Sequence, residues 1–238
     1  FSIRGFFSTI KNSILERFFL NTHQQTTISI LGCGWYGLPL AKKLVSLGYH
    51  VKGSTTSVSK IETLKEAGIV PFLVEVTPLE TVPFPLEFLD ADVLVLNIPP
   101  VRREDIEEYY YIQMKQLLNH IKKSKLRKIV FISSTSVYPD NSNDTSEDQK
   151  ISPDKPSGKA LLKVENSFKE YEGLKVLILR FAGLFGADRN PGRFLAEKRD
   201  LKDGNAPVNL VHLDDCVEIT VQFLQKNFYG ETFNVCAD

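Results

Sequence analysis

The sequence lacks several features that mark particular classes of protein. Its 238 residues include 3 cysteines, and 29 basic side chains are balanced by 29 acidic ones. Cys33, Cys216 and Cys236 are scattered without C-x-x-C spacing, which argues against a disulfide framework and against a metal site. The absence of net charge favours neither nucleic acid nor a membrane surface as a partner. The scattered cysteines fit a reducing cytosol, so we expect a cytoplasmic protein. No apolar run approaches the ~20 residues that span a bilayer, so we also expect it to be soluble.

Residues 1–25 stand apart from the rest of the chain. Arg4, Lys11 and Arg17 are spaced through an apolar and Ser/Thr-rich stretch, with only Glu16 against them. This composition fits a cleaved organellar presequence, and it fits an upstream segment of other origin equally well. We therefore expect this N-terminal extension not to belong to the fold.

The most informative segment is TISILGCGWYG, an apolar strand that runs into a G-x-G-x-x-G turn and then a helix. Gly32 allows a tight turn, Gly34 removes a side chain that would hold backbone away from a pyrophosphate, and Gly37 lets the helix lie close to the strand. The free N–H groups at the positive end of the helix, near Trp35 and Tyr36, suit phosphate oxygens. The segment predicts a dinucleotide site.

The end of the second strand bears on the choice of cofactor. An acidic residue about 20 positions into the fingerprint would bind the ribose 2′-hydroxyl and favour NAD, but none stands between the glycine turn and the next predicted helix. Ser54, Thr55 and Thr56 offer hydroxyls there, with Lys52 and Lys60 nearby. These groups suit a 2′-phosphate, although an ordinary turn would have the same composition. The predicted cofactor is NADP or NAD, with NADP favoured.

Strand and helix signals alternate along the remaining chain. This alternation predicts an α/β fold, a Rossmann-type doubly wound parallel sheet with its ligand at the carboxyl ends of the strands. We assign residues 26–182 to the NAD(P)-binding domain and residues 183–238 to a small substrate-side region. Because this region ends directly after a strand-like segment, without a closing helix, its pattern is that of a truncated region. Further strands are predicted at 69–75, 91–97, 127–133, 174–180 and 232–235, and helices at 104–123, 158–171 and 214–227.

Four further segments carry a family resemblance. FISSTSVY ends the fifth strand, and PSGKALLKVE, LRFAGLFG and VHLDD follow it in order. Together they resemble the extended short-chain dehydrogenases/reductases, the epimerase/dehydratase group, over residues 27–238. The glycine turn lacks one residue of the usual extended-family turn, so the chain resembles an atypical member.

The resemblance assigns catalytic roles that this chain fills only in part. Ser134 stands at the family serine that binds the substrate oxygen, or it serves only as a strand-end hydroxyl bonded to local backbone. The family's Tyr-x-x-x-Lys pair falls on Ser157 and Leu161, which cannot supply an acid and a charge that tunes it. Tyr138 is a candidate replacement acid, although the family tyrosine at this place normally packs.

Other positions acquire binding roles through the same resemblance. Glu75 stands at the family's acidic position after the third strand, where it would accept the adenine amino group. Asn97 and Pro99 lie where the cofactor would pass, although the prolines also stop the strand. Arg180 and Arg193 suit substrate phosphates because of their planar fork. The alternative for Glu75 is an exposed carboxylate at the end of a strand, and the alternative for Arg180 and Arg193 is a surface ion pair.

The VHLDD segment combines an imidazole with two carboxylates. We interpret Asp214 or Asp215 as the N-cap of the last helix and His212 as a structural residue. The sequence therefore predicts an NAD(P)-dependent oxidoreductase or epimerase-like enzyme acting on a small or nucleotide-linked carbonyl or hydroxyl substrate. The missing pair leaves a non-catalytic dinucleotide-binding or redox-sensing module as the alternative, and the oligomeric state stays open.

Overall fold

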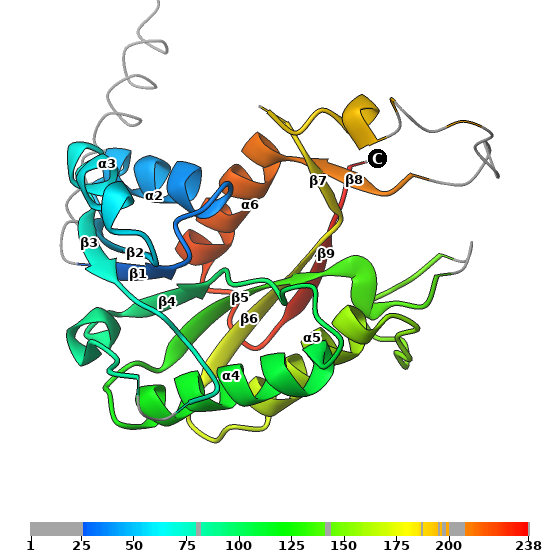
Figure 1. Ribbon diagram of the computed structural model, residues 1–238, viewed down its shortest axis with the longest axis horizontal. Coiled ribbons are helices and arrows are strands. Elements are labelled where there is room, and N and C mark those ends of the chain that lie inside the picture. Colours follow the sequence, from blue (N-terminus) through cyan, green and yellow to red (C-terminus); the bar gives the residue numbers. More distant parts are fainter. Residues whose placement is uncertain are drawn as a thin grey trace, which may run out of the picture.

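A computed structural model of the chain shows a sheet between two layers of helices (Figure 1). The predicted N-terminal extension lies outside the described residues. The structure describes residues 26–79, 82–140, 144–186, 188–194, 196, 199 and 208–237.

The predicted alternation of strands and helices is present, with boundaries shifted by a few residues. The strands are β1 Thr27–Leu31, β2 His50–Thr55, β3 Val70–Leu73, β4 Val93–Leu96, β5 Lys128–Ser134, β6 Lys175–Phe181, β7 Gly183–Phe185, β8 Leu210–His212 and β9 Thr232–Val235. The α-helices are α2 Gly37–Ser46, α3 Ile61–Glu66, α4 Ile106–Lys122, α5 Pro156–Lys169 and α6 Leu213–Lys226. Short 3-10 turns lie at Val58–Lys60, Leu86–Leu89, Thr135–Val137 and Pro191–Phe194. Among the described helices, none has both the length and the apolar character of a membrane span.

The main sheet is parallel throughout and has the strand order β3-β2-β1-β4-β5-β6-β9. Ile28 of β1 pairs with Val51 of β2 on one side and with Val93 of β4 on the other. The chain thus builds outward from β1 in one direction and then returns to build in the other. This topology confirms the predicted doubly wound Rossmann-type fold.

Each face of the sheet is covered by its own helices. Side chains of β4 alternate between the two cores: Val93 and Val95 join one, and Leu94 and Leu96 join the other. Helices α2, α3 and α6 cover the first face, and α4 and α5 cover the second (Figure 1). Because both faces are covered, the central strand β4 is apolar and buried along its whole length.

The C-terminal region contributes to the main layers as well as to a separate pair of strands. β7 and β8 form a two-stranded parallel sheet beyond the end of β6. The chain then returns, because α6 packs against α2 and β9 pairs with β6. Residues 213–235 therefore pack into the same sheet and helix layer as residues 27–182, and the described part outside these layers is centred on β7 and β8. The boundary at residue 183 stays a prediction.

Candidate functional site

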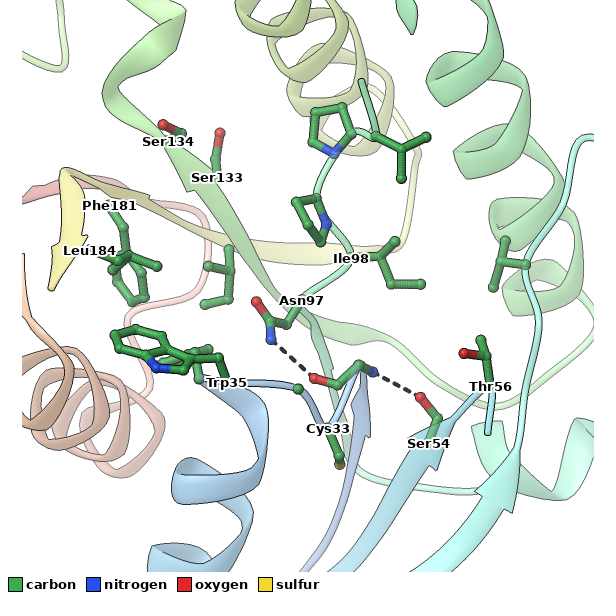
Figure 2. A pocket seen from close by; sticks show the side chains of 18 of the residues that line it. Cys33, Trp35, Ser54, Thr56, Asn97, Ile98, Ser133, Ser134, Phe181 and Leu184 are labelled. Carbon is green, nitrogen blue, oxygen red and sulfur yellow. Dashed lines mark hydrogen bonds between the residues drawn. The ribbon is translucent and has the colours of Figure 1, made fainter. Parts of the chain in front are cut away.

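A pocket of about 790 Å³ opens at the carboxyl ends of the parallel strands. It extends from the glycine turn after β1, past the ends of β2 and β4, to the serines that end β5 (Figure 2). Because β2 and β4 flank β1, the pocket lies where the strand order reverses, which is the general ligand position in open α/β sheets. The predicted site residues that line it are Gly32, Gly34, Trp35, Tyr36, Ser54, Thr55, Thr56, Glu75, Asn97, Pro99 and Ser134.

The three glycines of the turn have different physical reasons to be glycine. Gly32 has φ +108°, and a Cβ there would lie 2.4 Å from the Asn97 carbonyl oxygen. A Cβ at Gly37 would lie 2.1 Å from the Gly32 carbonyl oxygen, so α2 could not approach β1 as it does. A Cβ at Gly34 would meet nothing within 4 Å. Gly32 and Gly37 thus shape the turn, whereas Gly34 leaves open space beside the backbone.

Neighbouring strands hold the turn in place through hydrogen bonds. The Gly32 N–H donates to Ser54 Oγ at 2.8 Å, and the Cys33 N–H donates to the Ser54 carbonyl at 3.0 Å. The Asn97 side-chain amide donates to the Gly32 carbonyl at 3.0 Å (Figure 2). The N–H groups of Gly34 and Trp35 make no hydrogen bond within the described part of the chain. They are free for an anion at the start of α2.

The hydroxyls predicted near a 2′-phosphate are not equally available. Ser54 is buried and its Oγ accepts the Gly32 N–H. Thr55 Oγ1 accepts the Ser57 N–H at 3.1 Å. Thr56 is exposed at the pocket edge, and Lys60 also lines the pocket. Ser54 thus serves the turn, which leaves Thr56 and Lys60 as the groups suited to a phosphate.

One side of the pocket lies beyond the third strand. Glu75 is exposed and lines the pocket, with Val74 and Val76 buried on either side of it. Gln113 of α4 donates from Nε2 to the Val76 carbonyl at 2.7 Å. Tyr109, one helical turn earlier on α4, lines the same region. Sequence reasoning missed both α4 residues, although their i, i+4 spacing at the start of a helix beyond β4 was a usable signal.

The catalytic end contains the two strand-end serines. Ser133 Oγ donates to Glu165 Oε1 at 2.6 Å, so its proton is engaged away from the pocket. Ser134 Oγ accepts the Ser136 N–H at 3.1 Å. No acceptor for the Ser134 hydroxyl proton is present among the described residues. Of the two, Ser134 is therefore the serine able to donate to a ligand oxygen.

The two positions of the family's Tyr-x-x-x-Lys pair are held by Ser157 and Leu161, and the structure shows where each lies. Leu161, 4% exposed, lines the pocket at the lysine place. Ser157 is half-buried at the start of α5 and is absent from the pocket lining. Ile98, Ile132 and Phe181 make this end largely apolar. It offers a hydrogen-bond donor, Ser134, and an apolar surface, without an acid at either family position.

Cys33 lines the pocket without being a reactive thiol. Its side chain is 7% exposed, and burial raises the pKa of this thiol to about 12. The thiolate, which is the nucleophile in cysteine chemistry, is therefore scarce at neutral pH. Its Sγ packs against Gly53 of β2, where a Cβ would lie 2.7 Å from it. Cys33 has a packing role beneath the turn.

The structure argues against the substrate role predicted for Arg180 and the catalytic role predicted for Tyr138. Arg180 is 2% exposed and forms a buried ion pair with Glu165, 2.6 Å between Nη2 and Oε2. Its Nη1 donates to the Tyr138 hydroxyl at 2.8 Å, and that hydroxyl donates to Asn234 Oδ1 at 2.8 Å. Neither residue lines the pocket. A buried charge must be paired, and Arg180 is committed to that pairing.

Two further predictions concern the C-terminal region. The side chain of Arg193 lies outside what the structure describes, so its role stays a prediction. The N-cap of α6 is His212 rather than Asp214 or Asp215, because His212 Nδ1 accepts the Asp214 N–H at 3.2 Å. Histidine is not among the usual N-cap residues, which is why the sequence pointed to the acids.

A cation that contacts the predicted residue Trp35 escaped prediction. Arg189 lines the pocket, and its guanidinium lies 4.2 Å from the centre of the Trp35 ring. The indole Nε1 of Trp35 donates to Asp188 Oδ1 at 2.6 Å. The sequence placed an arginine of this loop at the site, but selected Arg193. Only the fold shows that Arg189 reaches the glycine turn.

The pattern of glycines, strand-end serines and strand order is characteristic of one family. The model of the NAD dependent epimerase/dehydratase family matches residues 28–236. The chain belongs to this family. The resemblance found in the sequence is therefore confirmed.

Members of the family and related structures resemble the chain over most of its length. Protein YeeZ of Escherichia coli (strain K12) is 37% identical over 212 residues, which cover 88% of this chain and 77% of YeeZ. The uncharacterized UDP-glucose epimerase YtcB of Bacillus subtilis (strain 168) is 27% identical over 136 residues, 51% of this chain and 43% of YtcB. The UDP-glucuronic acid 4-epimerase of Bacillus cereus, solved with UDP-glucuronic acid and NAD, has a TM-score of 0.71 at 24% identity, covering 89% of this chain and 78% of that one. At that identity the likeness concerns the fold.

Proposed function

We propose that the protein binds a nicotinamide dinucleotide in this pocket and uses it to exchange hydride with a small or nucleotide-linked hydroxyl or carbonyl compound. The observation that carries the proposal is the continuity of the pocket from the open backbone at Gly34 to the hydroxyl of Ser134. The family membership supports the cofactor class. The Bacillus cereus epimerase, solved with UDP-glucuronic acid and NAD, supports a nucleotide-linked substrate.

The residues of the turn fit a dinucleotide pyrophosphate. Gly34 leaves room for its oxygens, and the free N–H groups of Gly34 and Trp35 would donate to them at the start of α2. Thr56 and Lys60 would receive a 2′-phosphate, which favours NADP over NAD. Glu75 would accept the adenine amino group. The cofactor would then extend toward Asn97 and Pro99 and bring its nicotinamide to the apolar end.

The bound nicotinamide would supply or accept the hydride. Ser134 would donate its hydroxyl proton into a hydrogen bond with the substrate oxygen, because its Oγ already accepts the Ser136 N–H. Ile98, Leu161 and Phe181 would exclude water from the reacting carbon. Since Ser157 and Leu161 supply no acid–base pair, the proton must be exchanged with another group or with solvent. General acid–base help typically contributes 10²- to 10⁴-fold, so we expect slow turnover of ordinary nucleotide sugars.

One observation favours a second candidate, a cofactor-binding module without catalysis. Leu161 places a hydrocarbon where the family lysine would stand, and Ser157 is absent from the pocket lining. Such a module would bind the dinucleotide with the same residues and leave it chemically unchanged.

Two measurements test the proposal and separate the candidates. Calorimetry with NAD and NADP tests binding, and no heat with either at millimolar concentration would contradict both candidates. Incubation with NADPH deuterated at the nicotinamide C4 and a panel of carbonyl compounds, UDP-linked ones included, then tests chemistry by mass spectrometry. Deuterium in a product supports the enzyme. Binding without deuterium transfer to any compound supports the module.

A further inference from the structure

The segment after β7 brings a cation to the glycine turn. Trp35 Nε1 donates to Asp188 Oδ1 at 2.6 Å, and the Arg189 guanidinium lies 4.2 Å from the centre of the Trp35 ring. Trp35 and Arg189 both line the pocket. The indole therefore connects two segments more than 150 residues apart, 153 positions in the case of Trp35 and Asp188.

The backbone fixes the position of Arg189. The Arg189 N–H donates to the Gly186 carbonyl at 2.8 Å, and the Gly186 N–H donates back to the Arg189 carbonyl at 3.1 Å. Gly186 has φ +120°, a conformation that favours glycine. A side chain that leaves a doubly bonded turn and stacks on an aromatic ring has little freedom to move. Its approach to the pocket is thus built into the fold.

The guanidinium is available for an anion. Arg189 forms no ion pair within the described residues, and the nearest candidate partner in sequence, Asp188, already accepts a hydrogen bond from Trp35. Its planar fork suits two phosphate oxygens at once. Stacking on the indole leaves the edge of that fork free, because cation–π contact uses its face.

The glycine turn itself carries no charged side chain. Among the described residues that line the pocket, the positively charged ones are Lys60 and Arg189. Lys60 follows β2 on the side of Thr56, whereas Arg189 stacks on Trp35, and Figure 2 shows Thr56 and Trp35 on opposite sides of the turn. Arg189 is therefore the cation next to the free N–H groups of Gly34 and Trp35.

We propose that Arg189, positioned by Trp35 and Asp188, binds the pyrophosphate of the dinucleotide over the glycine turn. The inference rests on the proposed function, because it takes a dinucleotide as the ligand of the pocket. It adds a binding group from the segment after β7 to a site otherwise formed by the first β-α-β unit. Cofactor binding would then also stabilise the arrangement of that segment over α2.

Calorimetric titration of NAD and NADP tests the inference on four variants. Arg189→Ala removes charge and fork, Arg189→Lys keeps the charge alone, and Trp35→Phe keeps a ring but loses the bond to Asp188. Arg102→Ala is the matched control, since Arg102 is exposed and does not line the pocket. Thermal unfolding without ligand shows whether each variant is folded.

Hydrogen bonds to charged groups correspond to about 10- to 100-fold in affinity. We expect this loss in Arg189→Ala for NAD and NADP alike, a smaller loss in Arg189→Lys and in Trp35→Phe, and none in Arg102→Ala. The wild-type affinity should also fall more steeply with added salt than that of Arg189→Ala. If Arg189→Ala does not fold, Arg189→Gln, which removes the charge and keeps most of the side-chain length, replaces it, with the same expected loss and the same shallower salt dependence.

Other outcomes overturn the inference in distinguishable ways. If the wild type binds a dinucleotide and Arg189→Ala binds it equally well, the role of Arg189 is wrong while the proposed function stands. If the loss appears only when UDP is titrated into protein saturated with NADP, Arg189 binds a substrate diphosphate. Its assignment to the cofactor pyrophosphate is then wrong, while the proposed function stands. If the wild type binds neither dinucleotide, the inference and the proposed function both fail.

Discussion

The two ends of the pocket depend on different features of the chain, one on backbone geometry and the other on the identity of side chains. At the glycine end, backbone geometry makes the site: Gly32 and Gly37 shape a turn, and Gly34 leaves its N–H groups open. At the catalytic end, side-chain identity makes the site. There Ser134 keeps a free hydroxyl proton, whereas Leu161 stands at the family lysine's place. The first end has the open backbone that the proposed cofactor requires, and the second lacks the family's acid–base pair.

This difference shows which part of the site the fold requires and which part it does not. The turn depends on a few glycines without which α2 could not lie against β1, so the fold itself requires it. On α5, Leu161 at the family lysine's place is part of the buried apolar core. Family membership therefore supports the binding site more strongly than the chemistry.

The largest expected effect concerns the buried network behind the catalytic end. If Arg180 is structural, Arg180→Met leaves Glu165 as an unpaired buried charge and should lower the free energy of unfolding by about 3–5 kcal/mol. Urea unfolding measures this change. The double variant Arg180→Met/Glu165→Leu should recover part of the loss, because it removes both charges. Unchanged stability with weaker substrate binding would restore the role predicted from the sequence.

A carboxylate at the glycine end should have the next largest effect. Gly34→Asp places a negative charge against the pyrophosphate, and like charges in contact cost several kcal/mol, so we expect about 100-fold weaker dinucleotide binding or worse. The variant should fold, since a Cβ at Gly34 meets nothing within 4 Å. Gly34→Asn is the matched neutral control and should lose less in calorimetric titration. Equal affinities of Gly34→Asp and the wild type would place the cofactor elsewhere.

The sequence predicted the geometry of the glycine turn because its signal is local. A strand, three spaced glycines and a helix lie within one short segment, and their geometry follows from the backbone. Arg180 was misread because its partner, Glu165, lies on another element and only the fold brings them together. Arg189 was missed for the same reason, because the residue that it contacts, Trp35, lies far away from it in the sequence. The sequence therefore predicted the strand, turn and helix of one β-α-β unit, whereas contacts between elements, including that of Ser54 with the Gly32 N–H, required the fold.

Variants of two serines, Ser134 and Ser157, test the catalytic end of the pocket. Ser134→Ala should lower the rate of carbonyl reduction by about 10- to 100-fold, since a hydrogen bond to developing charge contributes ~1.5–3 kcal/mol. Ser157→Ala should have little effect, because Ser157 is absent from the pocket lining. Steady-state rates on a substrate found by the deuterium screen decide. A severe loss in Ser157→Ala, with Ser134→Ala near wild type, would contradict the assignment to Ser134 and place the chemistry on Ser157.

The smallest expected effect is a change of cofactor preference at the pocket edge. Thr56 is exposed and adjoins the pocket with Lys60, so we expect the wild type to bind NADP more tightly than NAD. Thr56→Asp should reverse the order by about tenfold, because its carboxylate would repel a 2′-phosphate and accept a hydrogen bond from a 2′-hydroxyl. Thr56→Asn offers the same shape without charge and should shift the preference less. Added salt should weaken the discrimination, since an exposed charge pair is screened. Titrations of both cofactors at two salt concentrations measure this, and a clear wild-type preference for NAD would rule the assignment out.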